Sequence, residues 1–144
     1  MTAIFENARI RFLYPENWTI AEDGSTEPAT VTVQSPNSGF WTLVMYSDDH
    51  DPDELTSQVV SAMDEEYEAL ESIPTTLDLG GVEAHGYEMY FSCLDLVVSA
   101  KTFALRHNDL TLLILWQGES RDFDELELVF QAMTLGMLQS PSDG

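Results

Sequence analysis

The densest group of side chains that could do chemistry is the acidic run Asp48–Glu54, which holds five carboxylates and one histidine. Clustered carboxylates are the ligands that hard divalent cations prefer. Asp49, Asp51 and Asp53 have the alternate spacing of an EF-hand loop, but Glu stands where that loop needs Gly and Val where it needs its last Glu. A metal site at these three aspartates is therefore the weaker of two interpretations, the other being the start of a helix.

Other chemically competent side chains are scattered along the chain. His50, His85 and His107 fall in different predicted elements and lack the close spacing of a zinc site. Cys93 is the only cysteine, so it can form no intrachain disulfide, and its apolar neighbours of the same parity favour a buried thiol. No serine lies in a nucleophile elbow or a triad pattern. We therefore predict that the protein is not an enzyme and holds no cofactor.

Three side chains are candidates for a partner surface. Lys101 is the only lysine and is predicted to lie opposite Trp116, which suggests either a cation–π contact or an aliphatic stem packed on the ring. Trp41 and Trp116 are expected in the core or at its edge. If Trp41, Trp116 and Lys101 were left exposed, that patch would mark a protein-binding surface.

These residues are positioned by a predicted run of strands over Leu77–Trp116. Gly80-Gly81 and Asn108-Asp109 are two-residue hairpin turns, because each pair tolerates positive φ. The turns fix the register, which pairs Leu79 with Val82, Leu77 with Ala84, Leu105 with Leu112, Phe103 with Ile114 and Lys101 with Trp116. The apolar parity changes near Gly86, which predicts a β-bulge there. The segment therefore reads as an up-and-down meander.

Both faces of the last predicted hairpin are apolar, so a helix must cover each face. One helix is predicted from Asp51, with Asp51 as N-cap and Pro52 at the first position, and it ends before Pro74. Its apolar stripe is Leu55, Val59, Met63, Tyr67 and Leu70. The other is predicted over 122–136, with the stripe Phe123, Leu126, Phe130, Met133 and Met137, widened by Leu128, Val129 and Leu135.

The first part of the chain adds short strands, predicted at 8–14, 18–22, around Val31 and Val33, and at 40–46. The strand at 40–46 is apolar on both faces and should be internal. The sequence thus predicts an α+β fold: a three-layer α/β/α sandwich around a mainly antiparallel sheet with a C-terminal meander. Residues 1–138 are predicted to form one domain, with 139–144 as a frayed tail.

Composition narrows the class of partner. The 144 residues carry 26 acidic and five basic side chains, a net charge of -21, with 44% hydrophobic residues. This leaves no basic patch for nucleic acid or anionic lipid, so neither is expected to bind. No segment is long and apolar enough to insert into a membrane, and a cytoplasmic location is predicted. The acidity is consistent with adaptation to salt or with steering towards a basic partner.

The spacing Phe12-x-Tyr14-Pro15-x-x-Trp18, with the order of elements that follows it, resembles the PsbP/Mog-like superfamily. That superfamily includes photosystem II PsbP, the Ran-binding Mog protein, DcrB-like proteins and chaperones of type VI secretion effectors. The residue before the Trp is often Gly in the family and is Asn17 here. The resemblance implies an α/β/α sandwich and domains that generally bind proteins rather than perform chemistry.

Three functions remain open from the sequence. The first is a non-catalytic protein-binding module, acting as a chaperone or adaptor, whose sheet face or edge accepts a polypeptide. The alternative is a divalent-metal-binding or metal-dependent protein that uses the acidic run Asp48–Glu54. The third is a salt-adapted protein with a structural role.

Overall fold

A computed structural model describes residues 1–7, 9–25 and 27–139. Its helices are α1 (Pro52–Glu66) and α2 (Ser120–Gln139). Its strands are β1 (Thr2–Glu6), β2 (Arg11–Pro15), β3 (Thr19–Asp23), β4 (Ala29–Gln34), β5 (Phe40–Tyr46), β6 (Glu71–Leu79), β7 (Val82–Cys93), β8 (Leu96–His107) and β9 (Leu110–Glu119). β1 and β2 form a separate antiparallel hairpin beside α2, and β1 has no counterpart in the sequence prediction.

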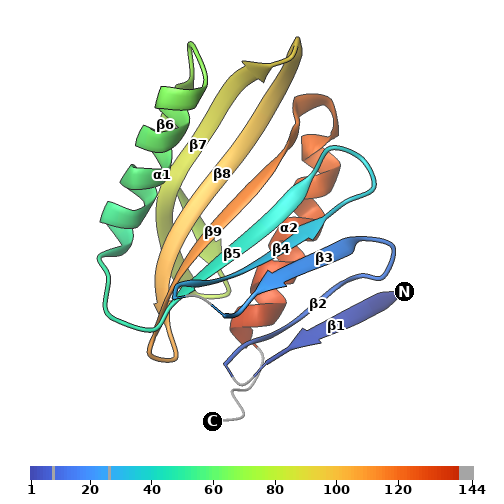
Figure 1. The fold of residues 1–144 in the computed structure, drawn as a ribbon, viewed down its shortest axis with the longest axis vertical. Helices are drawn as coiled ribbons and strands as arrows, with labels where there is room; N and C mark the ends of the chain where they lie inside the picture. Colours follow the sequence, from blue (N-terminus) through green and yellow to red (C-terminus); the bar gives the residue numbers. More distant parts are fainter. Residues whose placement is uncertain (8, 26, 140–144) are drawn as a thin grey trace.

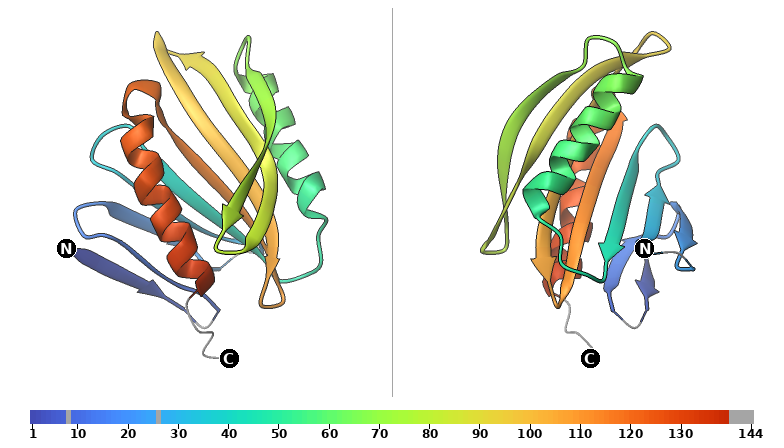
Figure 2. Two further views of the ribbon diagram at one scale, coloured as in Figure 1. Left: turned by 180° about the vertical axis from the view of Figure 1, so that it is seen from behind. Right: turned by 60° about the vertical axis from the view of Figure 1, so that its left-hand side comes forward.

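The other seven strands form one antiparallel sheet in the order β3-β4-β5-β9-β8-β7-β6. The helix α1 covers one face and α2 the other, as Figures 1 and 2 show. The predicted α+β three-layer sandwich is therefore confirmed. β5 lies between β4 and β9, so the prediction that this strand is internal is also confirmed.

The meander has the predicted register. Leu79 pairs with Val82 across the Gly80-Gly81 turn, and Leu105 pairs with Leu112 across the Asn108-Asp109 turn. All four turn residues have positive φ, as the two-residue hairpin requires. The predicted turns therefore gave the correct pairing of β6 with β7 and of β8 with β9.

The predicted bulge at Gly86 is wrong. Strand pairing passes through Gly86 on both sides without an inserted residue. The parity changes because the two ends of β7 lie under different helices: Ala84 packs in the core on the α2 side, whereas Met89 and Phe91 pack against α1. Gly is needed because a Cβ at this position would lie 1.8 Å from the carbonyl oxygen of Thr102.

The start of α1 agrees with the prediction. The Asp51 side chain caps the helix by accepting a hydrogen bond from the Asp53 backbone N–H at 3.0 Å, and Pro52 is the first helical residue. The helix ends at Glu66, so Tyr67 of the predicted stripe lies beyond it. The Tyr67 ring nevertheless packs on the same apolar cluster as the helical residues Val59 and Met63.

The helix α2 is longer than predicted. All five residues of its apolar stripe are buried, but Leu128 is 70% exposed and does not widen the buried face. Gln139, the first residue of the predicted tail, is the last residue of α2. Residues 140–144, the rest of the predicted tail, lie outside the described residues.

The tryptophans of the predicted partner surface are in the core. Trp41 and Trp116 pair across β5 and β9 and are both 0% exposed. The Trp41 indole N–H donates to Thr134 of α2 at 2.9 Å, while the Trp116 indole N–H has no hydrogen-bond partner among the described residues. A partner surface at Trp41 and Trp116 is therefore wrong, because α2 covers both rings.

Candidate functional site

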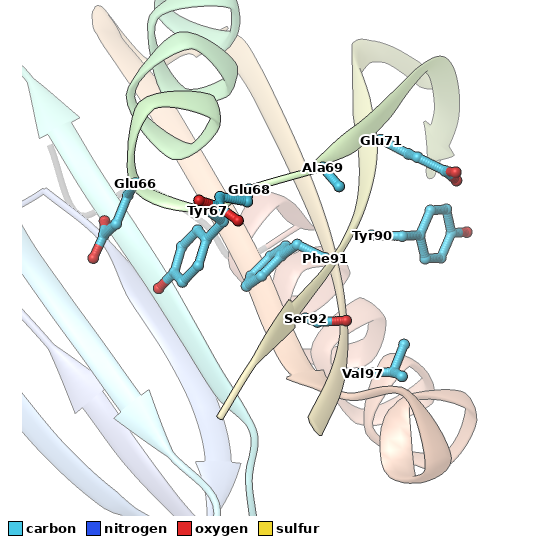
Figure 3. Close-up of a pocket in the computed structure, with 9 residues that line it drawn as sticks. All are labelled: Glu66, Tyr67, Glu68, Ala69, Glu71, Tyr90, Phe91, Ser92 and Val97. Atoms are coloured by element: carbon cyan, nitrogen blue, oxygen red, sulfur yellow. The ribbon is translucent and has the colours of Figure 1, made fainter. Parts of the chain in front are cut away.

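A surface hollow of ≈ 570 Å³ lies where β7 runs past the start of β6. We call it the edge notch. It is lined by residues 66–69 and 71, from the end of α1 to the start of β6, and by 90–92 of β7 and Val97 of β8 (Figure 3).

The notch exists because β6 is shorter than β7 at this end of the sheet. Glu71, the first residue of β6, pairs with Tyr90, but β7 continues to Cys93 and is paired there with β8 alone. The chain reaches Glu71 from α1 through Ala69, whose φ of 57° turns it away from the helix axis. The sheet therefore lacks an edge strand beside the last residues of β7.

Aromatic side chains line both faces of the notch. On the α1 face the Tyr67 ring stacks on Phe91, with centroids 4.2 Å apart and an angle of 26° between the planes. On the other face Tyr90 donates a hydrogen bond from its hydroxyl to Glu88 at 3.0 Å. Figure 3 shows the Tyr67 and Phe91 pair on one side and Tyr90 with Val97 on the other. An entering side chain would meet an aromatic ring on either face.

The pKa of both phenols is raised above the ordinary tyrosine value. Burial raises the pKa of Tyr67, and the nearby charge of Glu66 adds to the effect. Burial also raises the pKa of Tyr90, helped by the hydrogen bond to Glu88. The two rings therefore act as polarised apolar surfaces with a hydroxyl at the tip.

Three exposed carboxylates surround these rings: Glu66, Glu68 and Glu71. None of them is in an ion pair within the described residues. Three of the arginines pair with other carboxylates, and Lys101 pairs with Glu127 and with Glu88, the hydrogen-bond acceptor of Tyr90. The charges of Glu66, Glu68 and Glu71 themselves have no paired cation among the described residues. Carboxylates beside aromatic faces attract cationic side chains.

Three carboxylates of the acidic run Asp48–Glu54 have separate partners. Asp51 caps α1, Asp49 pairs with Arg106 at 3.1 Å, and Asp48 contacts His50 at 2.9 Å. The described residues contain no group of three His, Cys, Asp or Glu side chains placed to share an ion. The alternative metal site at Asp49, Asp51 and Asp53 is therefore not supported, because helix capping and ion pairing direct the carboxylates to different partners.

We expect excess calcium or magnesium to leave the thermal midpoint of unfolding unchanged to within about 1 °C. A ligand raises the midpoint only if the folded protein binds it, and the acidic run, which the structure describes in full, offers no shared set of ligands. The measurement is a thermal melt followed by circular dichroism, with chelator as the comparison and sodium chloride at equal ionic strength as the control. Stabilisation by calcium beyond the salt control would restore the acidic run as a metal site.

The other candidate residues are not brought together. Lys101 is 20% exposed at its side chain and pairs with Glu88 at 3.6 Å and with Glu127 of α2. It has the predicted place opposite Trp116, but its ammonium is held by carboxylates rather than by the ring. Cys93 is half-buried against the α1-side cluster. His85 pairs with Glu83, far in sequence from His50.

Sequence reasoning missed the edge notch. Its two ring partners, Tyr67 and Phe91, come from different elements, and Tyr67 was assigned to a helical stripe. A signal was present in the segment Glu66–Glu71, where glutamates flank an aromatic residue directly after the helix. Only the pairing of Glu71 with Tyr90 shows that these glutamates lie beside an open sheet edge.

The sequence matches no protein-family model and no curated protein. Solved structures with the same fold are nevertheless found. The cyanobacterial PsbP protein of Synechocystis, CyanoP, has a TM-score of 0.64 at 9% identity, covering 94% of this chain and 91% of its own. LpqN of Mycobacterium tuberculosis, involved in cell envelope biogenesis, has a TM-score of 0.56 at 13% identity, covering 98% and 91%.

A protein of unknown function from Pseudomonas aeruginosa, PA94, has a TM-score of 0.55 at 8% identity, covering 97% of this chain and 98% of its own. These likenesses give the chain a PsbP-like fold, as the sequence resemblance predicted. In the part of the chain that the structure describes, neither α1 nor α2 has the length and apolar character of a membrane-spanning helix.

Proposed function

We propose that this domain is a non-catalytic protein-binding module that takes a basic polypeptide segment at the edge notch. The observation that carries the proposal is the combination in one hollow of stacked and opposed aromatic rings with three unpaired glutamates. Such a site offers recognition: rings to pack on, carboxylates to attract a cation, and a phenol to hydrogen-bond.

The charge of the whole chain supports a basic partner. With a net charge of -21, long-range attraction raises the encounter rate of a cationic partner and repels acidic ones. The notch adds local selectivity, because an acidic segment would place like charges beside Glu66, Glu68 and Glu71. A chaperone or adaptor role in the cytoplasm would use the same chemistry, and that role and that location stay predictions.

The proposal predicts that neutralising the notch weakens binding. The triple variant Glu66→Gln, Glu68→Gln, Glu71→Gln is expected to bind a fluorescein-labelled peptide of alternating lysine and valine about tenfold more weakly, since each exposed ion pair contributes up to about 1 kcal/mol. Fluorescence anisotropy at low salt measures the affinity. Raising the ionic strength should reduce the difference, because exposed charges are screened.

The matched control is Glu16→Gln, Glu22→Gln, Glu125→Gln, which removes the same charge from three exposed sites elsewhere. This variant is expected to lose only the weak, long-range part of the attraction. Equal loss in the two triple variants would mean that net charge alone attracts the peptide, and the edge notch would no longer be the binding site.

A further inference from the structure

Each residue of β7 directs its backbone N–H and C=O either towards β6 or towards β8. The turns at the two ends of β7 show which residues point each way. The closing pair of a two-residue hairpin exchanges both of its backbone hydrogen bonds. Leu79 and Val82 close the turn to β6, so Val82 and every second residue after it direct their N–H and C=O towards β6. This series ends at Tyr90, opposite Glu71.

The turn to β8 gives the same result independently. Leu94 and Asp95 both have positive φ, and they are closed by the pair Cys93 and Leu96. Cys93 and every second residue before it therefore direct their backbone groups towards β8. Ser92 belongs to the other series, so its N–H and C=O point away from β8, to the place where β6 would lie if it were longer.

No strand residue occupies that place. Ser92 is exposed and lines the edge notch, and no hydrogen bond joins it to the α1–β6 connection in the part of the chain that is described. A free donor and a free acceptor on one strand residue are the elements that an added strand pairs with.

We propose that the edge notch binds its partner by strand addition: a residue of an extended, basic segment pairs with Ser92 through two backbone hydrogen bonds. Successive side chains of an extended segment point to opposite faces. The residue opposite Ser92 would then project towards Tyr90 and Val97, and its neighbours towards Tyr67 and Phe91. This binding mode rests on the proposed function, and it adds main-chain recognition to charge.

The outer edge of β6 is less suited to strand addition. By the same parity, the even-numbered residues of β6 face outwards, and Pro74 occupies one of these positions. Proline has no N–H, so it removes a donor from that edge. Pro74 therefore interrupts the row of outward donors on β6 and leaves Thr76 and Asp78 on one side of it and Ser72 on the other.

The test uses the lysine–valine peptide and two versions of it, N-methylated at every lysine or at every valine. Methylation removes N–H donors along one edge of an extended peptide and leaves its side chains and charge in place. Strand addition predicts that one version binds at least about tenfold more weakly while the other binds like the parent, because only one edge faces Ser92. Equal affinities, or equal losses, would overturn strand addition and leave the proposed function standing. Failure of the parent peptide to bind would overturn both.

In the protein, Ser92→Pro removes the Ser92 N–H that points into the edge notch. This variant should bind the parent peptide more weakly by a similar factor. Thr76→Pro is the matched control, since it makes the same change at an outward position of β6 outside the notch. Thermal melts establish that both variants fold. Wild-type affinity in a folded Ser92→Pro variant would overturn strand addition, and if that variant does not fold, the methylated peptides decide.

Discussion

Replacing Gly86 with alanine will lower the free energy of unfolding by about 3 kcal/mol, a large effect for adding one methyl group. A Cβ at Gly86 would lie 1.8 Å from the carbonyl oxygen and 2.8 Å from the carbonyl carbon of Thr102. These atoms belong to the backbone of β8 in the middle of the sheet. The strain can be relieved only by moving a strand, because no flexible side-chain end is there to give way.

Urea unfolding followed by circular dichroism measures the effect. Gly136→Ala is the matched control, because a Cβ there meets nothing within 4 Å and the residue lies in α2. The free energy of unfolding of this control variant should rise by about 0.5–1 kcal/mol, because alanine is a better helix former than glycine. If Gly86→Ala were as stable as the wild type, the close approach of β7 to β8 would be incorrect, and a bulge at Gly86 would again be a reasonable interpretation.

Replacing Lys101 with methionine is expected to cost about 2 kcal/mol. Removing one partner of a fully buried ion pair costs about 3–5 kcal/mol, and we reduce this because the side chains of Lys101, Glu88 and Glu127 are 20%, 26% and 27% exposed. Stability is lost because Glu88 on β7 and Glu127 on α2 remain close to each other without the cation that both of them contact. Urea unfolding measures the loss.

The triple variant Lys101→Met, Glu88→Gln, Glu127→Gln separates this cause from the loss of packing. It should recover most of the stability, since no uncompensated charge then remains under α2. Full stability of Lys101→Met alone would show that water reaches the two carboxylates and that the ion pairs contribute little. Tyr90 of the edge notch donates a hydrogen bond to Glu88. The triple variant therefore also tests whether the ion pairs of Lys101 with Glu88 and Glu127 position the Tyr90 side chain.

Local features of the sequence predicted where hairpins turn and where α1 begins, because turns and helix caps depend on a few neighbouring residues. The Gly80-Gly81 and Asn108-Asp109 turns set the register of β6 with β7 and of β8 with β9, since each side chain of a strand takes its face from the turn. The cap at Asp51 placed the start of α1 for a similar reason, because its bond to the Asp53 N–H spans two residues.

The misses share a different cause. The parity change in β7 was attributed to a local irregularity at Gly86, whereas the two ends of the strand are covered by helices from distant parts of the chain. Trp41 and Trp116 were candidates for a partner surface if they were left exposed, but α2 lies over them. Leu128 was assigned to the buried face of α2 and is exposed. In each case burial depends on which element lies above the residue.

The acidic run shows both sides of this distinction. The sequence by itself determined that Asp51 would start a helix, and it predicted the fold and the register of the two hairpins at Gly80-Gly81 and Asn108-Asp109. Only the tertiary structure decided that Asp49 turns to Arg106, and that the glutamates after α1 stand beside an open strand edge with Tyr67, Phe91 and Tyr90. Turns and caps act over a few residues, whereas a binding hollow depends on the lengths of strands that meet only after folding.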